Sequence, residues 1–164
     1  MWKNPWPGRG GGKVAALPEY EAPTWNKERA PGSLANQDMA YQSLNGNAKG
    51  YSRHRRFAIN PVAAYPFKTI QHELSHIVHG HTTDEKLAEY GNHRGIFQFE
   101  AEGSAYLIMN KSGATDQFDA DESRHYVQSW LQGNKPDEKR IRRVFSTADR
   151  IIKAGREEPQ EKQE

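Results

Sequence analysis

One short segment near the middle of the chain places apolar residues along a single helical face. The spacing of three or four residues is that of an amphipathic helix, and the residues are Ile70, Leu74, Ile77 and Val78. Pro66 stands before them, where the first turn of a helix tolerates proline, and Gly80 stands after them, where helices often end. The pattern predicts a helix from about residue 66 to about residue 80.

The C-terminal half of the chain predicts three more helices. Residues 96 to 110 form a mostly apolar helical run, which we expect to be buried. A helix capped by Asp119 or Asp121 runs to about residue 131, and a break at residues 133 to 136 precedes a last helix over about 137 to 154. The last helix has one apolar face, made by Ile141, Val144, Phe145, Ala148, Ile151 and Ile152. Residues 81 to 95 are polar and turn-rich and predict no regular element.

Strand-like patterns occur only before the first of these helices. Residues 39 to 44 and 51 to 59 predict two strands, joined by a turn that contains Asn45-Gly46. Residues 24 to 29 predict a short helix. The fold class is therefore α+β, with a small antiparallel sheet packed on about four helices.

Composition divides the chain into three regions. Residues 1 to 37 are rich in glycine and proline and predict a tail or linker, residues 38 to 155 predict one domain, and residues 156 to 164 predict a charged, disordered tail. Only 35% of the residues are hydrophobic, and the mean hydropathy is -1.00. We therefore expect a polar chain whose ends do not pack.

The expected compartment is the cytoplasm, with no membrane association. The sequence has no apolar stretch of transmembrane length, and its first residues lack the apolar segment of a secretion signal. It contains no cysteine, which excludes disulfides and leaves His, Asp and Glu as metal ligands.

Basic residues gather in two places, although the formal net charge is only +2. One group is Lys49, Arg53, Arg55 and Arg56; the other is Lys135, Lys139, Arg140, Arg142 and Arg143. Such groups are usually solvated faces of helices or strands. Tyr51 and Phe57 flank the first group, however, and aromatic residues among basic ones are typical of a groove for single-stranded DNA.

The strongest chemical signal is His72-Glu73-Leu74-Ser75-His76, inside the predicted helix 66 to 80. Residues four apart project from the same helical face, so His72 and His76 can bind one zinc ion. Glu73 then lies beside the metal, where it can take a proton from metal-bound water. The alternative is a surface helix with two ordinary histidines.

A zinc site of this kind needs a third protein ligand, and the predicted helix 96 to 110 offers two. Glu100 and Glu102 point about 200° apart on a helix, so only one can face the metal. Glu102 lies in the apolar arc of this helix, where an ionised carboxylate is costly unless it is paired or metal-bound. We therefore expect Glu102 as the ligand, with Glu100 in reserve. A pairing of Glu102 with an arginine such as Arg94 is the alternative.

Other residues near the motif are candidates for supporting roles. His79 and His81 can be a structural helix cap or hold a metal ligand in place. His93 and Arg94, and Tyr106 one turn beyond Glu102, can stabilise an oxyanion. The alternative for each is a surface or packing residue.

The segments NGNAKGYSRHRRFAINPVAAYPFKTIQHELSHIVHGHT, FEAEGSAYLI and DESRHYVQSWLQG resemble the C-terminal zincin domain of ArdC-type antirestriction proteins. These belong with the ImmA/IrrE-like gluzincins and are carried by phages, plasmids and bacterial hosts. The resemblance covers roughly residues 39 to 155. It implies a zincin-like fold with His72 and His76 as zinc ligands and Glu73 as the base. The Glu of an Ala-Glu-x-x-Ala segment, here Glu102, is then the third ligand.

This chain departs from the family at its N-terminal side. Complete members place a single-stranded-DNA-binding domain before the zincin domain, whereas here 38 residues precede the part of the chain that the resemblance covers. The expected function is a zinc-dependent metallopeptidase that acts on a protein or peptide in antirestriction or regulation. The alternative is a non-catalytic, zinc-stabilised module that binds single-stranded DNA or a host defence protein.

Overall fold

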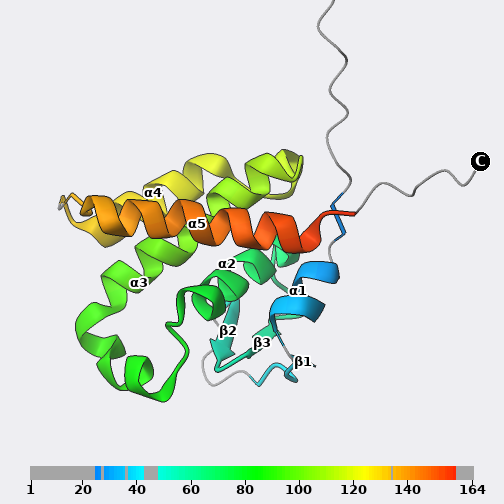
Figure 1. Ribbon diagram of the computed structural model, residues 1–164, viewed down its shortest axis with the longest axis horizontal. Helices are drawn as coiled ribbons and strands as arrows, with labels where there is room; N and C mark the ends of the chain where they lie inside the picture. The colour runs from blue at the N-terminus through cyan, green and yellow to red at the C-terminus, as the bar shows by residue number, and fades with distance from the viewer. Residues whose placement is uncertain (1–24, 27, 36, 43–47, 134, 158–164) are drawn as a thin grey trace, which may run out of the picture.

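The computed structural model describes residues 25–26, 28–35, 37–42, 48–133 and 135–157. This part of the chain is α+β (Figure 1). Its helices are α1 (Arg29–Leu34), α2 (Pro66–His79), α3 (Asp84–Lys111), α4 (Ala120–Leu131) and α5 (Glu138–Gly155), with a short 3-10 helix η1 (Thr115–Gln117). Its strands are β1 (Gln37–Asp38), β2 (Gly50–Arg53) and β3 (Arg56–Ile59).

The small sheet differs from the predicted one. Its strand order is β1-β3-β2, with β2 antiparallel and β1 parallel to β3. The predicted strand 51 to 59 is a hairpin by itself, and its turn places His54 at a φ of 53°. The predicted strand 39 to 44 is wrong for residues 39 to 42, which lie outside any strand, and its last two residues lie outside the described part of the chain. The predicted Asn45-Gly46 turn lies outside the described residues.

The hairpin turn depends on a contact from a distant part of the chain. The backbone N–H of His54 donates to the carbonyl oxygen of Thr82 at 2.8 Å, and the Thr82 hydroxyl donates back to the carbonyl oxygen of His54. Thr82 belongs to the connection between α2 and α3. Local sequence patterns cannot report such a contact, which explains why the hairpin was not predicted.

Helix α2 begins and ends as the sequence predicts. Pro66 occupies its first turn, and Gly80 follows it with a φ of 78°, in the left-handed conformation that glycine adopts without strain. The predictions for α4 and α5 are also confirmed, because Asp119 and Asp137 cap these helices through their side chains.

Helix α3 is much longer than predicted. It has 28 residues and begins at Asp84, so the prediction of irregular structure over residues 81 to 95 is wrong for most of that segment. The Thr83 hydroxyl accepts from the backbone N–H of Lys86, and Asp84 and Glu85 lie in the first turn, where acidic side chains favour helix formation. Residues 91 to 94 are exposed, so hydrophobic patterning gives no signal there.

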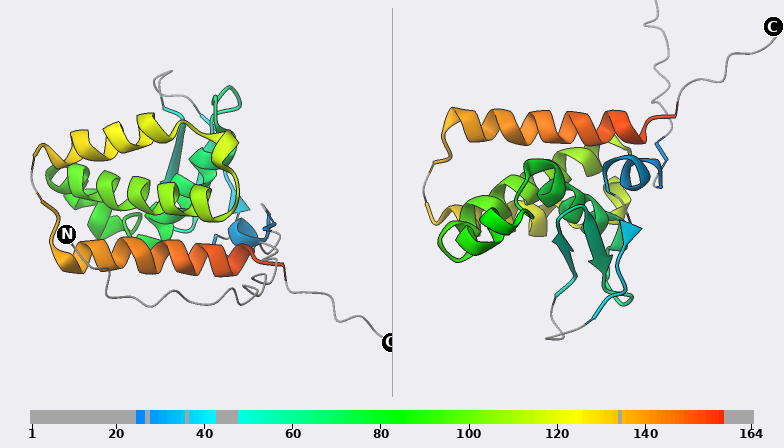
Figure 2. Two further views of the ribbon diagram at one scale, coloured as in Figure 1. Left: turned by 90° about the horizontal axis from the view of Figure 1, so that it is seen from above. Right: turned by 60° about the horizontal axis from the view of Figure 1, so that its bottom comes forward.

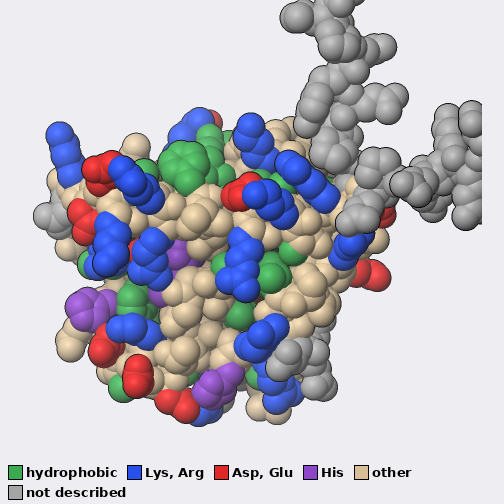
Figure 3. All heavy atoms as spheres, in the orientation of Figure 1, with side chains coloured by type: hydrophobic (Ala, Val, Ile, Leu, Met, Phe, Trp, Pro, Cys, Tyr) green, Lys and Arg blue, Asp and Glu red, His purple; other side chains and the backbone are tan. Residues whose placement is uncertain are grey.

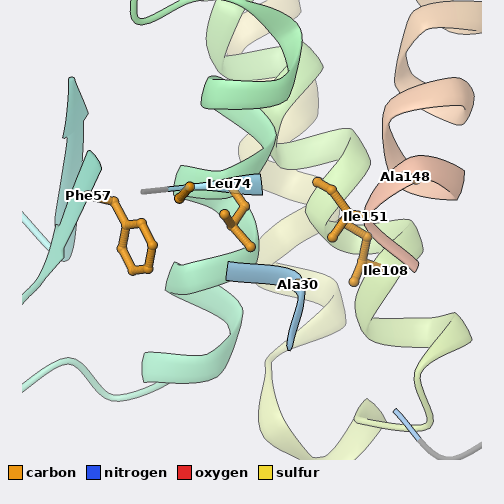
Figure 4. Packing of buried hydrophobic residues seen from close by; sticks show 7 residues of the cluster. Ala30, Phe57, Leu74, Ile108, Ala148 and Ile151 are labelled. Atoms are coloured by element: carbon orange, nitrogen blue, oxygen red, sulfur yellow. The ribbon is translucent and has the colours of Figure 1, made fainter. Parts of the chain in front are cut away.

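The elements form layers around α2 and α3. The sheet and α5 lie on opposite sides of these two helices, and α4 runs along α3 (Figures 1 and 2). A cluster of buried side chains joins the layers (Figure 4): Ala30, Ala35, Phe57, Leu74, Ile108, Ala148 and Ile151. Leu74 and Ile151 are fully buried, so burial on this scale supplies the main stabilising free energy.

Part of the predicted N-terminal tail packs into this core. Ala30 on α1 is fully buried, and the indole N–H of Trp25 donates to the carbonyl oxygen of Ile152 at 3.1 Å. The short helix expected over residues 24 to 29 is instead α1, which begins where that prediction ends. Residues 1–24, and most of the predicted C-terminal tail, lie outside the described part of the chain.

None of the helices in the described residues combines the length and apolar character needed to cross a membrane. The first basic group lies at the β2–β3 hairpin, and the second lies at the start of α5. On the face shown in Figure 3, Lys and Arg side chains are dispersed among acidic and uncharged ones. Lys49 pairs with Glu122 at 3.1 Å, and Arg53 lies 3.8 Å from Asp84, so acidic partners offset part of the first group.

Candidate metal centre

The two histidines of the motif converge on α2. Their Nε2 atoms lie 3.2 Å apart, and their rings meet edge to face with centroids 4.8 Å apart. Two imidazole nitrogens bound to one tetrahedral zinc ion are ~3.3 Å apart, given a Zn–N distance of about 2.0–2.1 Å. The spacing of His72 and His76 therefore fits a shared metal ion.

Hydrogen bonding supports the same fit for His72. Its Nδ1 lies 2.8 Å from Oε2 of Glu102, and an ionised carboxylate can only accept, so Nδ1 carries the proton. In the neutral ring, Nε2 then presents a lone pair toward His76. That lone pair is satisfied either by a proton on Nε2 of His76 or by a cation between the two nitrogens.

Glu102 is fully buried on α3 and has three hydrogen-bond partners. Lys68 Nζ lies 2.6 Å from its Oε1, the Ser123 hydroxyl donates to the same oxygen, and His72 binds the other one. Burial alone raises the pKa of Glu102, but the hydrogen bond from His72 and the charge of Lys68 outweigh it and lower the pKa to about 2. The carboxylate is therefore ionised, and its charge partner is Lys68, not Arg94.

The structure brings Glu102 to the site, but to Nδ1 of His72 and not to Nε2. A carboxylate bonded to Nδ1 orients a metal-binding imidazole, whereas direct ligation requires that the carboxylate turn toward the Nε2 pair. The role of Glu102 as third ligand stays a prediction.

Glu73 lies beside the histidine pair and is almost fully buried. The hydroxyl of Ser52 on β2 donates to its Oε2 at 2.6 Å. Gly50, two residues earlier, permits this approach, because a Cβ there would lie 2.9 Å from both the Ala58 carbonyl oxygen and Cγ2 of Thr69. Burial raises the pKa of Glu73, opposed by the nearby His72 and by Ser52, so this carboxylate holds a proton more readily than an exposed one.

A second group of potential ligands lies behind the pair. His79, His81 and Glu100 are buried and each offers a donor atom within 4.8 Å of the others, so this group could hold a metal ion. Among the described residues, Glu102 belongs to no such group of three. Glu100, the reserve ligand, faces this second group, and its Oε2 lies 2.8 Å from Nε2 of His81.

Charges around Glu100 come from α5. Arg140 Nη1 and Arg143 Nη1 lie 3.3 Å and 3.4 Å from its Oε1. Burial alone raises the pKa of Glu100, but the hydrogen bond from His81 and the charge of Arg143 lower it overall. Burial lowers the pKa of His79 to about 3 and lowers the pKa values of His76 and His81, so all three rings are neutral near pH 7.

The histidine pair opens on a cleft of about 530 Å³. Strand β2, helices α2, α3 and α4, and the turn before α4 line it. Several polar lining residues were not singled out from the sequence: Ser52, Lys68, Tyr90, Gln98, Ser123 and Tyr126. The Gln98 amide nitrogen lies 3.3 Å from Nε2 of His76 and donates to the Tyr90 hydroxyl at 2.7 Å.

The expected oxyanion stabilisers are placed unequally. Arg94 lines the cleft, with its guanidinium 5.1 Å from the centre of the Trp130 ring. His93 is exposed beside Phe97, and Tyr106 contacts Phe118, and neither lines the cleft. Tyr90 and Tyr126 line it in their place. Helical spacing offers a signal for one of them, since Tyr126 follows Ser123 by three residues.

Comparison of the chain with known proteins gives no matching family model, no matching curated protein and no matching solved structure. The resemblance to ArdC-type proteins therefore stays a prediction, and the site geometry carries the functional argument.

Proposed function

We propose that the protein is a zinc-dependent peptidase with its active site at the motif on α2. The observation that carries this proposal is the 3.2 Å spacing of the two Nε2 atoms, with the buried Glu73 beside them in a cleft. His72 and His76 would hold the ion, and Glu102 is the nearby carboxylate that can complete the set. When bound, zinc supplies a water of lowered pKa and polarises a carbonyl oxygen.

Glu73 is the base in this proposal. Its raised pKa suits a group that must accept a proton from water and later return it to the leaving amine. The Ser52 hydroxyl holds one carboxylate oxygen, which leaves the other available for the proton. Glu73 therefore performs both proton transfers from one position.

The other polar groups of the cleft would bind the substrate. The Tyr90 and Tyr126 hydroxyls contact Gln98, whose amide nitrogen lies close to Nε2 of His76. Hydroxyl and amide groups placed there can donate to the carbonyl oxygen of a peptide. The resemblance to ArdC-type proteins supports an antirestriction or regulatory role, with a host or element-encoded protein as target.

The decisive variant is Glu73→Gln, which keeps the shape of the side chain but removes its basicity. We expect cleavage to fall by roughly a hundred-fold or more, while zinc content and thermal unfolding stay close to those of the wild type. Cleavage of a proteome-derived peptide mixture, followed by mass spectrometry, measures this without a known substrate.

Glu89→Gln is the matched control, because Glu89 is exposed on α3 and outside the cleft. It should cleave like the wild type. The peptidase proposal would be contradicted if the zinc-loaded wild type cleaved nothing in the mixture. It would also be contradicted if Glu73→Gln cleaved at the wild-type rate. Function in the absence of cleavage would favour the non-catalytic zinc-stabilised module.

A further inference from the structure

We propose that Glu100 and His81 form a relay that fixes the proton of His76 on Nδ1 and so keeps its Nε2 free for a metal ion. The proposal rests on the metal site proposed above for His72 and His76. Glu100 and His81 are positioning residues here, since they act through His76. The relay accounts for a buried polar cluster that the peptidase mechanism does not otherwise use.

The first link is the carboxylate of Glu100. Its Oε1 faces the guanidinium groups of Arg140 and Arg143 at 3.3 Å and 3.4 Å, and its Oε2 lies 2.8 Å from Nε2 of His81. Two adjacent positive charges keep this carboxylate ionised, and an ionised carboxylate can only accept hydrogen bonds. Nε2 of His81 must therefore carry the proton.

The second link joins the two histidines. A neutral imidazole has one N–H, so His81 with its proton on Nε2 has only a lone pair on Nδ1. This Nδ1 lies 3.0 Å from Nδ1 of His76, and a hydrogen bond at that distance needs a donor. The donor must be His76, whose own Nε2 is then unprotonated and faces His72.

Packing prevents the His81 ring from reversing this order. The ring stacks on those of His79 and Phe97, with centroids 5.0 Å and 4.3 Å away and planes inclined by 4° and 15°. His81 is also buried, with a side chain only 3% exposed. These stacking contacts and the burial hold the ring with Nε2 toward Glu100 and Nδ1 toward His76.

The arginines argue against a second metal ion in the His79, His81 and Glu100 group. Arg140 and Arg143 already supply positive charge to Glu100, and a divalent ion there would be repelled by both. Each histidine of the motif is thus linked to one carboxylate on α3. Glu102 contacts His72 directly, and Glu100 is linked to His76 through His81.

The tautomer of His76 can be measured directly, without zinc and without activity. Histidine-¹⁵N-labelled, metal-free protein at about pH 8 gives separate nitrogen shifts for protonated and unprotonated ring positions. We expect His76 to show a protonated Nδ1 and an unprotonated Nε2. His76 with its proton on Nε2 in the wild type would overturn the relay, even if the protein binds zinc as proposed.

Substitution of His81 then tests the consequence for the metal. His81→Phe keeps a ring that can stack on His79 and Phe97 but removes the acceptor, so we expect the His76 tautomers to mix and zinc affinity to fall roughly 10- to 100-fold. His79→Phe is the matched control, because it keeps a ring against His81 and removes a nitrogen ligand of the cluster that takes no part in the relay. It should keep the wild-type zinc affinity and the wild-type His76 spectrum.

Zinc stoichiometry separates the relay from a second metal site. One zinc per chain, unchanged in His79→Phe, supports the relay, whereas two per chain with one lost in His79→Phe would overturn it. Wild-type zinc affinity in folded His81→Phe would overturn it as well. If His81→Phe does not fold, the nitrogen spectrum of the wild type alone decides whether His76 carries its proton on Nδ1. Wild-type protein that binds no zinc would contradict the proposed function, and the same spectrum would still test the relay.

Discussion

Glu100 and Glu102 are two residues apart on α3 and are both fully buried, yet their surroundings differ. Glu102 lies at the cleft with one lysine, and that lysine is itself mostly buried. Glu100 lies behind the histidines with two arginines, whose side chains are 32% and 42% exposed. Glu102 thus borders the cleft that a metal ion would enter, whereas Glu100 does not line it. A buried carboxylate can bind an entering metal ion only where that ion can reach it and take over the role of its present cation.

The largest expected effect comes from removal of Glu102. Glu102→Ala should lower zinc affinity by more than the roughly 10- to 100-fold typical of an orienting residue, because a lost ligand costs more than a lost hydrogen bond. Isothermal titration with zinc under chelator competition measures this. Full zinc binding in Glu102→Ala, together with its loss in Glu100→Ala, would reverse the roles of the two carboxylates.

Lys68 should matter more for stability than for metal binding. Lys68→Met leaves Glu102 buried without its cation, which we expect to cost roughly 3 kcal/mol of unfolding free energy in the metal-free protein. Saturating zinc should recover most of this loss, since the ion replaces the missing charge. Urea unfolding with and without zinc measures both values, and a loss that zinc does not relieve would show that Glu102 does not approach the ion.

A fall in pH should first destabilise the cluster of His79, His81 and Glu100. The folded protein holds His79 at a pKa of about 3, below its ordinary value near 6.5, so the unfolded chain binds more protons between these values. Stability is therefore complete above about pH 6.5 and falls as the pH drops toward 3, by at most ~1.4 kcal/mol per pH unit for this histidine. His76 and His81 act in the same direction.

His79→Gln tests this assignment in the metal-free protein. It should flatten the dependence of unfolding free energy on pH between about 6.5 and 4. Urea titrations across that range give the slope. An unchanged slope would assign the acid sensitivity of this range to His76 and His81. Glu102, whose pKa is lowered from 4.5 to about 2, adds a loss of stability only at lower pH.

The smallest effect is expected from one of the arginines. Arg140→Gln should cost about 1 kcal/mol or less, because the side chain is partly exposed and Arg143 remains beside Glu100. The double variant Arg140→Gln/Arg143→Gln should cost more than the sum of the single ones, since it removes both cations from a buried carboxylate. Additive losses in urea unfolding would show that the two arginines do not share this role.

The sequence predicts α2, α4 and α5 well because their ends carry local signals. Pro66 and Gly80 mark α2, and Asp119 and Asp137 cap α4 and α5. The sequence does not predict the first half of α3, because nearly all of its residues are exposed or half-buried and its apolar residues do not recur at helical spacing. The His54 turn escapes prediction because Thr82, 28 residues away, holds it.

The sequence likewise predicts some features of the candidate site and not others. The pairing of His72 with His76 follows from helical periodicity alone. The burial of Glu102 could be argued from the apolar arc around it, but its contact with Nδ1 and its pairing with Lys68 depend on how α2 packs against α3. Ser52 comes from another element, and no local pattern connects it with Glu73.

The pair of hydrogen bonds between Thr82 and His54 has a mechanical consequence. Thr82 follows His81 directly, so the hairpin that forms one wall of the cleft is fastened to the backbone beside His81. The hairpin and His81, which contacts His76, should therefore move together or not at all. If the cleft widens for a bulky occupant, we expect the displacement at another wall, α4, where Gln132 and Gly133 have left-handed backbone conformations before α5.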